Sequence, residues 1–509
     1  MFPNFVALLI AFGVSALLAP LVARLARRLG VVDAPDRDRK FHLSSVPLTG
    51  GPTLLISGAI AIGVTWAVFP TVLRNTSGDR AFLTALFFAS LVIVGVGLLD
   101  DRFAVRGRQK LLGQLIAAVV MLLADITISR VSLFGWTIEF GDFAPLITVV
   151  WILGAINALN LIDGVDGLAS TTGIVLSLSI AAVAYVLGGR PDGILIALVL
   201  AGSLSGFLIH NFPPARMFLG DSGSMLIGLV LGAIALKTSI KGVAATALIM
   251  PTAIWAIPIF DVSMAIIRRK LTGRSIYATD RGHLHHCLER KGHGGSQVLL
   301  VVGSLCAMTG MGAIAGSALD NELVTLVVAM TAIFLLVVTR SFGHTEMGLI
   351  RNRIMRLAGS MINRPSTTNA GVNDEQAHLN GNHDWERLWV TLTEFAERFQ
   401  MDKVELMVSL PAVGEEYHAS WRRASSVEHH EAWKSEIPLV VEGMRVGHIR
   451  VEGAVGDGSI CEWMSNLIGG LKAFEEELIM LIRELRQQHD VSTGNVVTSA
   501  AEPQASIST

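Results

Sequence analysis

Long apolar segments recur along the first two thirds of the chain, and short polar connections separate them. A helix that crosses the hydrocarbon of a bilayer needs roughly 20 mostly apolar residues, and about eleven segments meet this requirement. They begin near residues 4, 50, 81, 111, 144, 168, 193, 223, 243, 298 and 322. The pattern therefore predicts an all-α polytopic membrane domain over residues 1–345.

The pattern changes after this domain, where polar residues replace the long apolar segments. Residues 346–384 predict a cytosolic linker, and residues 385–489 predict a small cytosolic α+β module. Two roles stay open for this module: a homodimer contact through residues 467–488, or the binding of another partner. The last segment, residues 490–509, is expected to be disordered.

The composition agrees with a membrane protein, because 51% of the residues are hydrophobic, 16% are charged and the mean hydropathy is +0.55. This balance excludes an ordinary soluble globular protein. The formal net charge of −2 gives no reason to expect nucleic acid as a partner. The three cysteines have no paired spacing, which argues against a disulfide framework or a thiolate zinc site. The apolar N-terminus lacks a basic region and predicts a retained first helix.

Lysine and arginine residues concentrate in alternate connections between the spans. The connections after the first, third and ninth spans and the tail after the last span are rich in them, and the other connections hold far fewer. Positively charged connections stay on the cytoplasmic side of a membrane. We therefore predict an N-terminus outside, a C-terminus inside and a location in the inner, or plasma, membrane.

Four polar patches occur in connections that this orientation places on the cytoplasmic side: Asp100-Asp101 and residues 157–166, 218–224 and 283–286. Adjacent carboxylates repel each other, and ionisable groups beside hydrocarbon are costly unless a partner stabilises them. Clustered carboxylates near lipid headgroups favour a divalent metal and a substrate that carries phosphate. Each patch taken alone has an ordinary alternative, such as a solvated helix end or a Gly-Asp turn.

The second and third patches combine carboxamides, carboxylates and glycines at short spacing. Asn157 and Asn160 lie three residues apart and can share one helical face. Gly220 lets backbone amides approach a phosphate at a helix start, and Asp221 suits a hard cation such as Mg2+. Ordinary N-capping is the alternative for Asp221.

Histidines and basic residues accompany these patches. His283, His285 and His286 have no thiolate partner, so a zinc site is a weaker interpretation than diphosphate binding or proton transfer. Lys40 and His42 lie in the first cytoplasmic connection and can contact anionic headgroups. The general positive charge of cytoplasmic connections is the alternative for these two residues.

Taken together, the blocks resemble in order, spacing and sidedness the polyprenyl-phosphate N-acetylhexosamine-1-phosphate transferases, a family of the glycosyltransferase family 4 type, over about residues 1–345. The resemblance implies that a UDP-N-acetylhexosamine (UDP-HexNAc) donates its sugar 1-phosphate to undecaprenyl phosphate and releases UMP. It also implies Mg2+ as the cofactor, with Mn2+ as a second candidate. The interrupted sequence HLHH favours the N-acetylglucosamine branch, and the muramoyl-pentapeptide phosphotransferase of peptidoglycan synthesis is the alternative.

The resemblance implies a role for each matching position. Asp100 and Asp101 match aspartates at the acceptor phosphate, of which one is sometimes assigned as the base. Asn160 and Asp221 match residues that hold the metal with the diphosphate. Asn157 matches a position at the substrate, and Asp163 and Asp166 match positions near the nucleoside and sugar. Phe218 matches an aromatic residue stacked on uracil, with Gly220 beside it. His283, His285 and His286 match positions near the diphosphate, and Lys40 and His42 match basic positions of the first connection. Ala104 departs from the family pattern, in which a polar or acidic residue is frequent.

Two other functional classes fit an apolar multi-span chain. A transporter predicts charged residues near the middle of the spans, whereas the charges here lie at one set of span ends, with Asp261 as an exception. A membrane sensor would use the C-terminal module as its output, but that module shows no phosphoacceptor or nucleotide-binding motif. The sequence therefore favours the enzyme.

Overall fold

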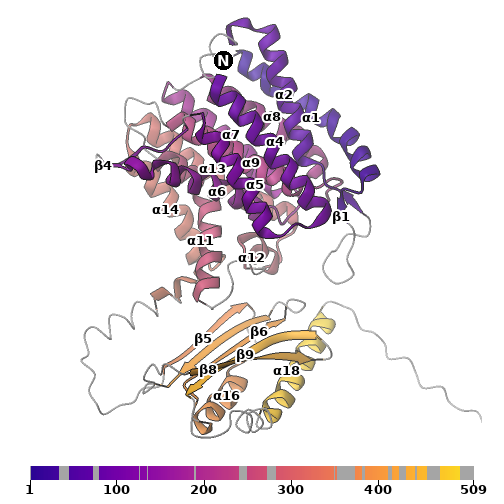
Figure 1. Ribbon diagram of the computed structural model, residues 1–509, viewed down its shortest axis with the longest axis vertical. Helices are drawn as coiled ribbons and strands as arrows, with labels where there is room; N and C mark the ends of the chain where they lie inside the picture. The colour runs from indigo at the N-terminus through magenta and orange to yellow at the C-terminus, as the bar shows by residue number, and fades with distance from the viewer. Residues whose placement is uncertain are drawn as a thin grey trace, which may run out of the picture. The chain divides into compact units, whose positions relative to one another are not determined.

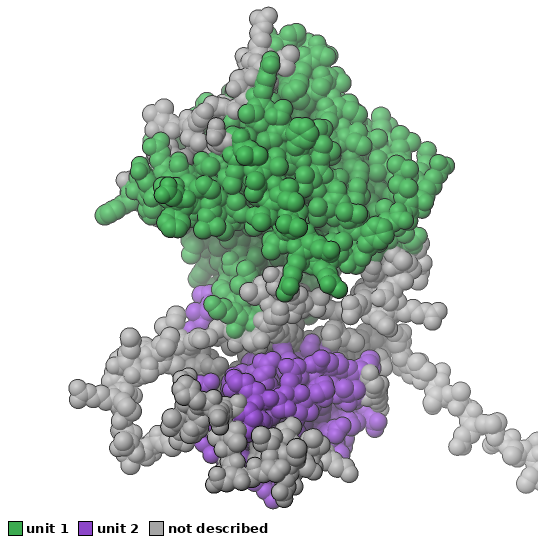
Figure 2. Space-filling model, viewed as in Figure 1, with its two compact units in different colours: residues 1–344 green, residues 345–509 purple. Residues whose placement is uncertain are grey.

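The chain forms two compact units, Met1–His344 and Thr345–Thr509 (Figure 2). Each unit has its own hydrophobic core. The computed structural model describes residues 2–33, 45–72, 80–124, 126–134, 136–188, 191–239, 249–271, 282–344, 346–348, 350–351, 373–380, 385–399, 401–410, 415–423, 432–441, 444–454 and 471–492.

The first unit is almost entirely helical (Figure 1). Its described helices are α1 (Phe2–Leu29), α2 (Gly50–Val68), α4 (Arg80–Phe103), α5 (Gly107–Leu122), η2 (Gly141–Phe143), α6 (Ala144–Ile162), α7 (Leu168–Val186), α8 (Pro191–Asn211), α9 (Gly220–Ser239), α10 (Ile249–Ile254), α11 (Ala256–Leu271), α12 (Leu284–Arg290), α13 (Gly295–Ala318) and α14 (Glu322–Val338). Two short antiparallel pairs lie in the connections: β1 (Val32–Asp33) with β2 (Val46–Pro47), and β3 (Arg130–Leu133) with β4 (Trp136–Glu139).

Within the described residues, 8 helical segments are long and apolar enough to cross a membrane: those of α1, α2, α4, α6 with η2, α7, α8, α9 and α13. The prediction of a helical, multi-pass membrane protein is thereby confirmed. The described helices at the other expected spans are shorter: α5, α14 and the pair α10 and α11, which is interrupted at Trp255. Pro258 lies in the first turn of α11, where a missing N–H is tolerated and a helix can restart. The count of about eleven spans and their orientation stay predictions.

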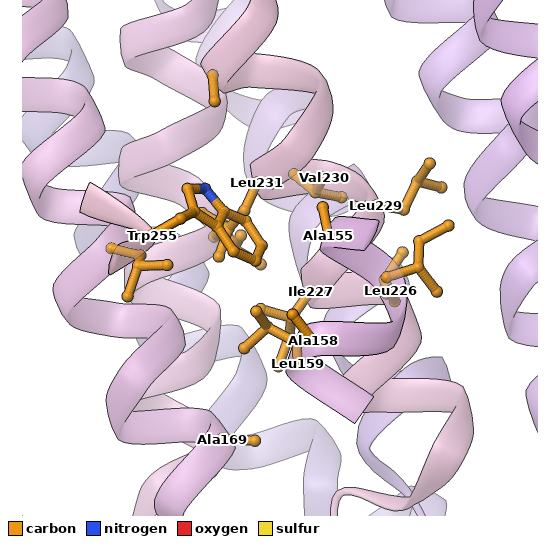
Figure 3. Packing of buried hydrophobic residues seen from close by; sticks show 14 of the residues in the cluster. Ala155, Ala158, Leu159, Ala169, Leu226, Ile227, Leu229, Val230, Leu231 and Trp255 are labelled. Carbon is orange, nitrogen blue, oxygen red and sulfur yellow. The ribbon is translucent and has the colours of Figure 1, made fainter. Parts of the chain in front are cut away.

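α9 is the central helix of the first unit, and 89% of the residues in its apolar segment are buried. Ile227 on α9 belongs to the same core cluster as Ala155 and Leu159 on α6 (Figure 3). Gly228 permits the close approach of these helices, because a Cβ there would overlap the backbone of Ala155. Small residues at such contacts are typical of membrane bundles. This packing holds the start of α9, with Asp221, against α6 and α4.

The second unit is a five-stranded antiparallel sheet with helices on one face (Figure 1). Its elements are β5 (Asn373–Asn380), α16 (Glu386–Arg398), β6 (Lys403–Leu410), β7 (Glu415–Arg422), β8 (Ala432–Val441), β9 (Met444–Ala454) and α18 (Lys472–Ser492), and the strand order is β5-β7-β6-β9-β8. Alternate residues of β6 are buried, and with Trp385, Trp389 and Trp421 they form one apolar core with the two helices. This is the α+β arrangement that the strand and helix patterns predict.

The edge of this sheet corrects the predicted boundary of the linker. The sequence predicts a linker over residues 346–384, but β5 occupies Asn373–Asn380 and pairs with β7. β5 is polar and lacks hydrophobic alternation, so its own sequence does not predict a strand. Its pairing with β7 identifies it as one. Residues 352–372 of the linker lie outside the described residues. α18 runs to Ser492, slightly past the predicted end of the module at residue 489, and the rest of the tail is likewise outside the described residues.

Candidate active site

The carboxyl end of α4 meets the amino end of α9, and a glycine makes this approach possible. A Cβ at Gly97 would overlap the backbone of Ser222. Asp101 accepts hydrogen bonds from the backbone N–H groups of Asp221, at 2.8 Å, and Ser222, at 3.3 Å. These donors have no partner within their own helix, and the helix dipole favours a negative group beside them. Asp101, which belongs to α4, therefore caps the amino end of α9.

Gly220 explains why the acidic pair can come this close to α9. Its φ is +72°, which favours glycine, and a Cβ would lie 2.8 Å from Asp101 Oδ2. Any side chain at this position would therefore displace the Asp101 carboxylate from the start of the helix. The glycine-acid-serine sequence of this patch thus has a structural role in addition to the proposed binding of phosphate.

Lys110 joins the two acidic patches from the start of α5. Its ammonium lies 2.8 Å from Asp100 Oδ2 and 2.5 Å from Asp221 Oδ2. The connection between α4 and α5 is short and the helices pack together, which brings Lys110 back to the aspartate pair. One cation thus compensates two partly buried carboxylates. In the sequence, Lys110 is one of several positive charges in its connection, and no local signal distinguishes it.

The two asparagines at the end of α6 have different partners. Asn160 donates from Nδ2 to Asp221 Oδ1, at 2.6 Å, and to Ser224 Oγ, at 3.0 Å. Asn157 instead forms a double amide contact with Gln114 of α5, at 2.8 Å and 3.3 Å. Gln114 is buried and was not predicted as a site residue. Asn160 therefore positions Asp221, whereas Asn157 joins α6 to α5.

The aspartates that follow α6 also differ in their environment. Asp166 Oδ2 accepts a hydrogen bond from the backbone N–H of Ala215, at 2.9 Å, and so holds the connection between α8 and α9. Asp163 lies in the turn between α6 and α7. Burial raises the pKa of Asp163 well above its usual value, and the negative charges of neighbouring aspartates raise it further: Asp221, Asp101 and Asp166. Asp163 thus belongs to the same electrostatic cluster as the acidic patches of α4 and α9.

The histidine segment reaches this cluster through His285. His285 is buried and lies directly against Gly164 of the α6–α7 turn, and its Nε2 has no hydrogen-bond partner among the residues that the structure describes. Burial lowers the pKa of His285 well below its usual value, and the nearby charges of His286, His283 and Arg290 lower it further. The lowered pKa favours the neutral imidazole, and the Nε2 of His285 lies beside the acidic turn.

The other two histidines have protein partners. His283 Nδ1 lies 2.9 Å from Asp261 Oδ2 in a buried pair, and the backbone N–H of Leu284 donates to Asp261 Oδ1 at 2.8 Å. Asp261 thus orients the histidine segment and caps the amino end of α12. These contacts explain why a charged residue occurs in an apolar span. His286 lies farther out, 3.1 Å from Glu289.

The end of the first connection also reaches the start of α9. The backbone N–H of Phe218 donates to Pro47 O at 3.0 Å, and that of Thr49 donates to Phe218 O at 3.1 Å. Phe218 is therefore held by backbone pairing with residues that follow the first predicted cytoplasmic connection. Lys40 and His42 lie outside the described residues, so their predicted roles stay predictions.

The donor atoms in this cluster match the preference of Mg2+. Asp100, Asn160 and Asp221 offer carboxylate and carboxamide oxygens, which are hard ligands. Within the described part of the chain, no three His, Cys, Asp or Glu side chains form a complete metal cage. Mg2+ sites that also bind substrate use one or two carboxylates together with phosphate oxygens and water. The residues present therefore fit a metal that arrives with a diphosphate.

Comparisons with known proteins identify relatives of this chain. Residues 83–239, which include both acidic helix ends and Asn160, match the family profile "Glycosyl transferase family 4". The chain is 32% identical over 301 residues to a probable undecaprenyl-phosphate N-acetylglucosaminyl 1-phosphate transferase of Bacillus subtilis, covering 58% of this chain and 81% of that protein. It is 33% identical over 341 residues to a decaprenyl-phosphate N-acetylglucosaminephosphotransferase of Mycobacterium tuberculosis, covering 61% and 82%.

A relative from the other branch is also similar. The chain is 29% identical over 307 residues to a phospho-N-acetylmuramoyl-pentapeptide-transferase of Moorella thermoacetica, covering 58% of this chain and 92% of that protein. The matched segment, the shared length with the relatives and the acidic cluster between α4, α6 and α9 lead to one conclusion: this chain belongs to glycosyl transferase family 4.

Proposed function

We propose that this chain transfers N-acetylglucosamine 1-phosphate from UDP-N-acetylglucosamine to undecaprenyl phosphate, releases UMP and so starts a lipid-linked glycan of the cell envelope. The observation that carries the proposal is the convergence of Asp100 and Asp221 on Lys110, with Asn160 hydrogen-bonded to Asp221. This cluster lies at the ends of helices that are apolar enough to span a membrane. A lipid phosphate at the membrane surface and a soluble nucleotide sugar can both reach such a position.

The proposed reaction is a phosphoryl transfer. A phosphate oxygen of the acceptor forms a bond with the β-phosphorus of the UDP-sugar. The bond between this phosphorus and the oxygen that bridges to the α-phosphate breaks, and its electron pair leaves with UMP. Bound Mg2+, held by Asp221 and Asn160, would supply charge neutralisation at the diphosphate.

The side chains of the cluster would then divide the work. Lys110 places a fixed positive charge between two carboxylates, where negative charge moves during the transfer. Asp100 would orient the acceptor phosphate or accept its proton, because Asp101 is already occupied by the start of α9. His285 would help to stabilise negative charge from its position beside the α6–α7 turn.

We also propose that this site faces the cytoplasm at the inner membrane. The connections that carry Asp100-Asp101 and the histidine segment are rich in lysine and arginine, and such connections stay inside. Counting the apolar spans assigns the other two patches to the same side. The C-terminal unit follows the last apolar helix and would lie on the same side. Mapping the accessibility of single cysteines in the connections of intact cells tests this orientation.

The decisive assay uses purified protein, labelled UDP-N-acetylglucosamine, undecaprenyl phosphate and Mg2+. We expect UMP and a lipid-linked sugar, product formation that tunicamycin inhibits, and loss of turnover on chelation that Mg2+ restores. Asp221→Asn should abolish UMP release while thermal unfolding stays unchanged, and near-normal turnover of this variant would refute the metal assignment. Use of UDP-N-acetylmuramoyl-pentapeptide as the preferred donor would move the chain to the branch of the Moorella relative.

A further inference from the structure

A second set of side-chain contacts lies one helical turn from the acidic cluster, on helices that also form the cluster. Lys110 and Gln114 are four residues apart on α5, and Asp221 and Met225 are four residues apart on α9. Residues at this spacing share one face of a helix. Lys110 and Asp221 belong to the cluster, whereas Gln114 and Met225 are 1% and 0% exposed and lie deeper between the helices.

Gln114 joins three helices in this deeper position. Its Oε1 accepts a hydrogen bond from Nδ2 of Asn157 on α6, at 2.8 Å, and its Nε2 donates to Oδ1 of the same side chain, at 3.3 Å. The Nε2 also donates to Sδ of Met225 on α9, at 3.4 Å. Asn157 Nδ2 donates a second time, to Leu153 O at 2.8 Å. The N–H groups of both amides therefore have enough acceptors within the protein.

The amide pair of Gln114 and Asn157 restricts α5 more than Lys110 does. A buried amide is costly unless it is hydrogen-bonded, so rotation of α5 that separates the pair is opposed. The ammonium of Lys110, in contrast, ends a flexible four-carbon side chain that is 19% exposed. The position of Lys110 thus depends on the helix that carries it, and the amide pair fixes that helix.

We propose that Gln114 and Asn157 are positioning residues for the transfer reaction. Their amide pair holds α5 at the rotation that places Lys110 between Asp100 and Asp221. Rotation of α5 about its axis would move the ammonium away from one of the two carboxylates. The inference gives Asn157 a role without substrate contact. It rests on the proposed function, because it requires a reaction in which the Lys110 charge faces a phosphate.

Three variants of the full-length protein isolate the amide pair. Gln114→Met removes the amide and keeps an unbranched side chain of similar size. An exchange variant carries Gln114→Asn together with Asn157→Gln, which restores two amides of the same combined length. Trp151→Phe is the matched control, because Trp151 Nε1 donates to Gly232 O, at 3.1 Å, and so removes a different hydrogen bond between α6 and α9.

UMP release measures the effect on turnover. We expect Gln114→Met to lower kcat by about 10- to 100-fold, the range for residues that orient a catalytic group. The KM for the UDP-sugar should change little, because the displaced charge acts on the transition state. Trp151→Phe should match wild type, and the exchange variant should exceed both of its single changes. Wild-type kcat in Gln114→Met would overturn the proposal, and so would an exchange variant no better than its single changes.

A second measurement reports the position of Lys110 and does not require turnover. A carbodiimide joins an amine directly to a carboxyl group in contact with it, and mass spectrometry of the peptides identifies the link. We expect links from Lys110 to Asp100 and Asp221 in wild type and Trp151→Phe, and a lower yield in Gln114→Met. Equal yields in Gln114→Met and wild type would overturn the proposal. Wild type that forms these links without releasing UMP would instead refute the proposed function.

Discussion

Lys110 compensates the negative charge of two carboxylates in the acidic cluster. Asp100 and Asp221 come from different helices, and both point an oxygen at the Lys110 ammonium. Two carboxylates this close to one cation repel each other once the cation is removed. Asp101 lies next to this pair, but it is a third carboxylate and is bound to the start of α9. It therefore cannot compensate for the loss of the cation.

We therefore expect Lys110→Gln to reduce the rate of transfer by about 100-fold or more, the typical cost of losing a charge that faces the reacting phosphate. UMP release from purified protein measures the effect. Lys291→Gln is the control, since Lys291 contacts Thr339 and Ser341 away from the cluster. A Lys110→Gln variant with the turnover of this control would show that Lys110 is only a structural bridge.

In the second unit, Glu405 predicts how stability depends on pH. Burial by itself would raise the pKa of Glu405, but the hydrogen bond and charge of Lys403 and the charges of His418 and Arg450 lower it below the ordinary value of 4.5. A carboxyl whose pKa is lowered by folding contributes stability above its unfolded pKa, and this contribution is lost as the pH falls through the folded pKa.

Glu405→Gln should therefore destabilise a fragment of residues 373–492 by about 1 kcal/mol at pH 7, the usual net contribution of one such interaction. The difference from wild type should shrink as the pH falls below 4.5. Urea unfolding at several pH values, followed by circular dichroism, measures it. A difference that grows towards acidic pH would contradict the assigned direction of the pKa change.

At the scale of elements, the contact between α4 and α9 positions the candidate site. Gly97 and Gly95 lie on the same helix, but only Gly97 faces the backbone of Ser222, whereas Gly95 faces open space. The spacing of two glycines in an apolar helix does not reveal this difference, because it depends on where α9 lies. The same sequence feature thus has two different structural meanings.

Gly97→Ala should separate α4 from α9, lower stability by roughly 1–3 kcal/mol as overpacking does, and strongly reduce transfer. Gly95→Ala should change neither property. Thermal unfolding in detergent and UMP release, measured on both variants, provide the comparison. Equal behaviour of the two variants would mean that α4 and α9 do not approach each other as described.

At the scale of the whole molecule, the division into two units predicts that catalysis resides in the first. Every described residue of the acidic cluster and the histidine segment lies within Met1–His344, and this unit has its own core. A chain truncated after Arg351 should therefore keep the transfer rate and the KM for the UDP-sugar. Loss of turnover in a truncated protein that is still folded would assign the second unit a direct role in the reaction.

The sequence alone determined the features that depend on local pattern. Apolar length predicted the membrane helices, and alternation predicted β6 and its neighbours. These properties can be predicted because a few neighbouring residues are sufficient to specify helix length, helical face and strand face. The sequence order of the patches was enough to indicate the family.

Only the tertiary structure decided which side chains meet. Lys110 between two aspartates, Gln114 opposite Asn157, Asp261 beside His283 and β5 at the sheet edge all depend on partners that are distant in the sequence. A local pattern does not encode such contacts, because the packing of small residues between helices determines the distances. The bonding of Asp101 to the α9 start and of Asp166 to Ala215 was decided in the same way, since a carboxylate binds the donors that the folded chain brings to it.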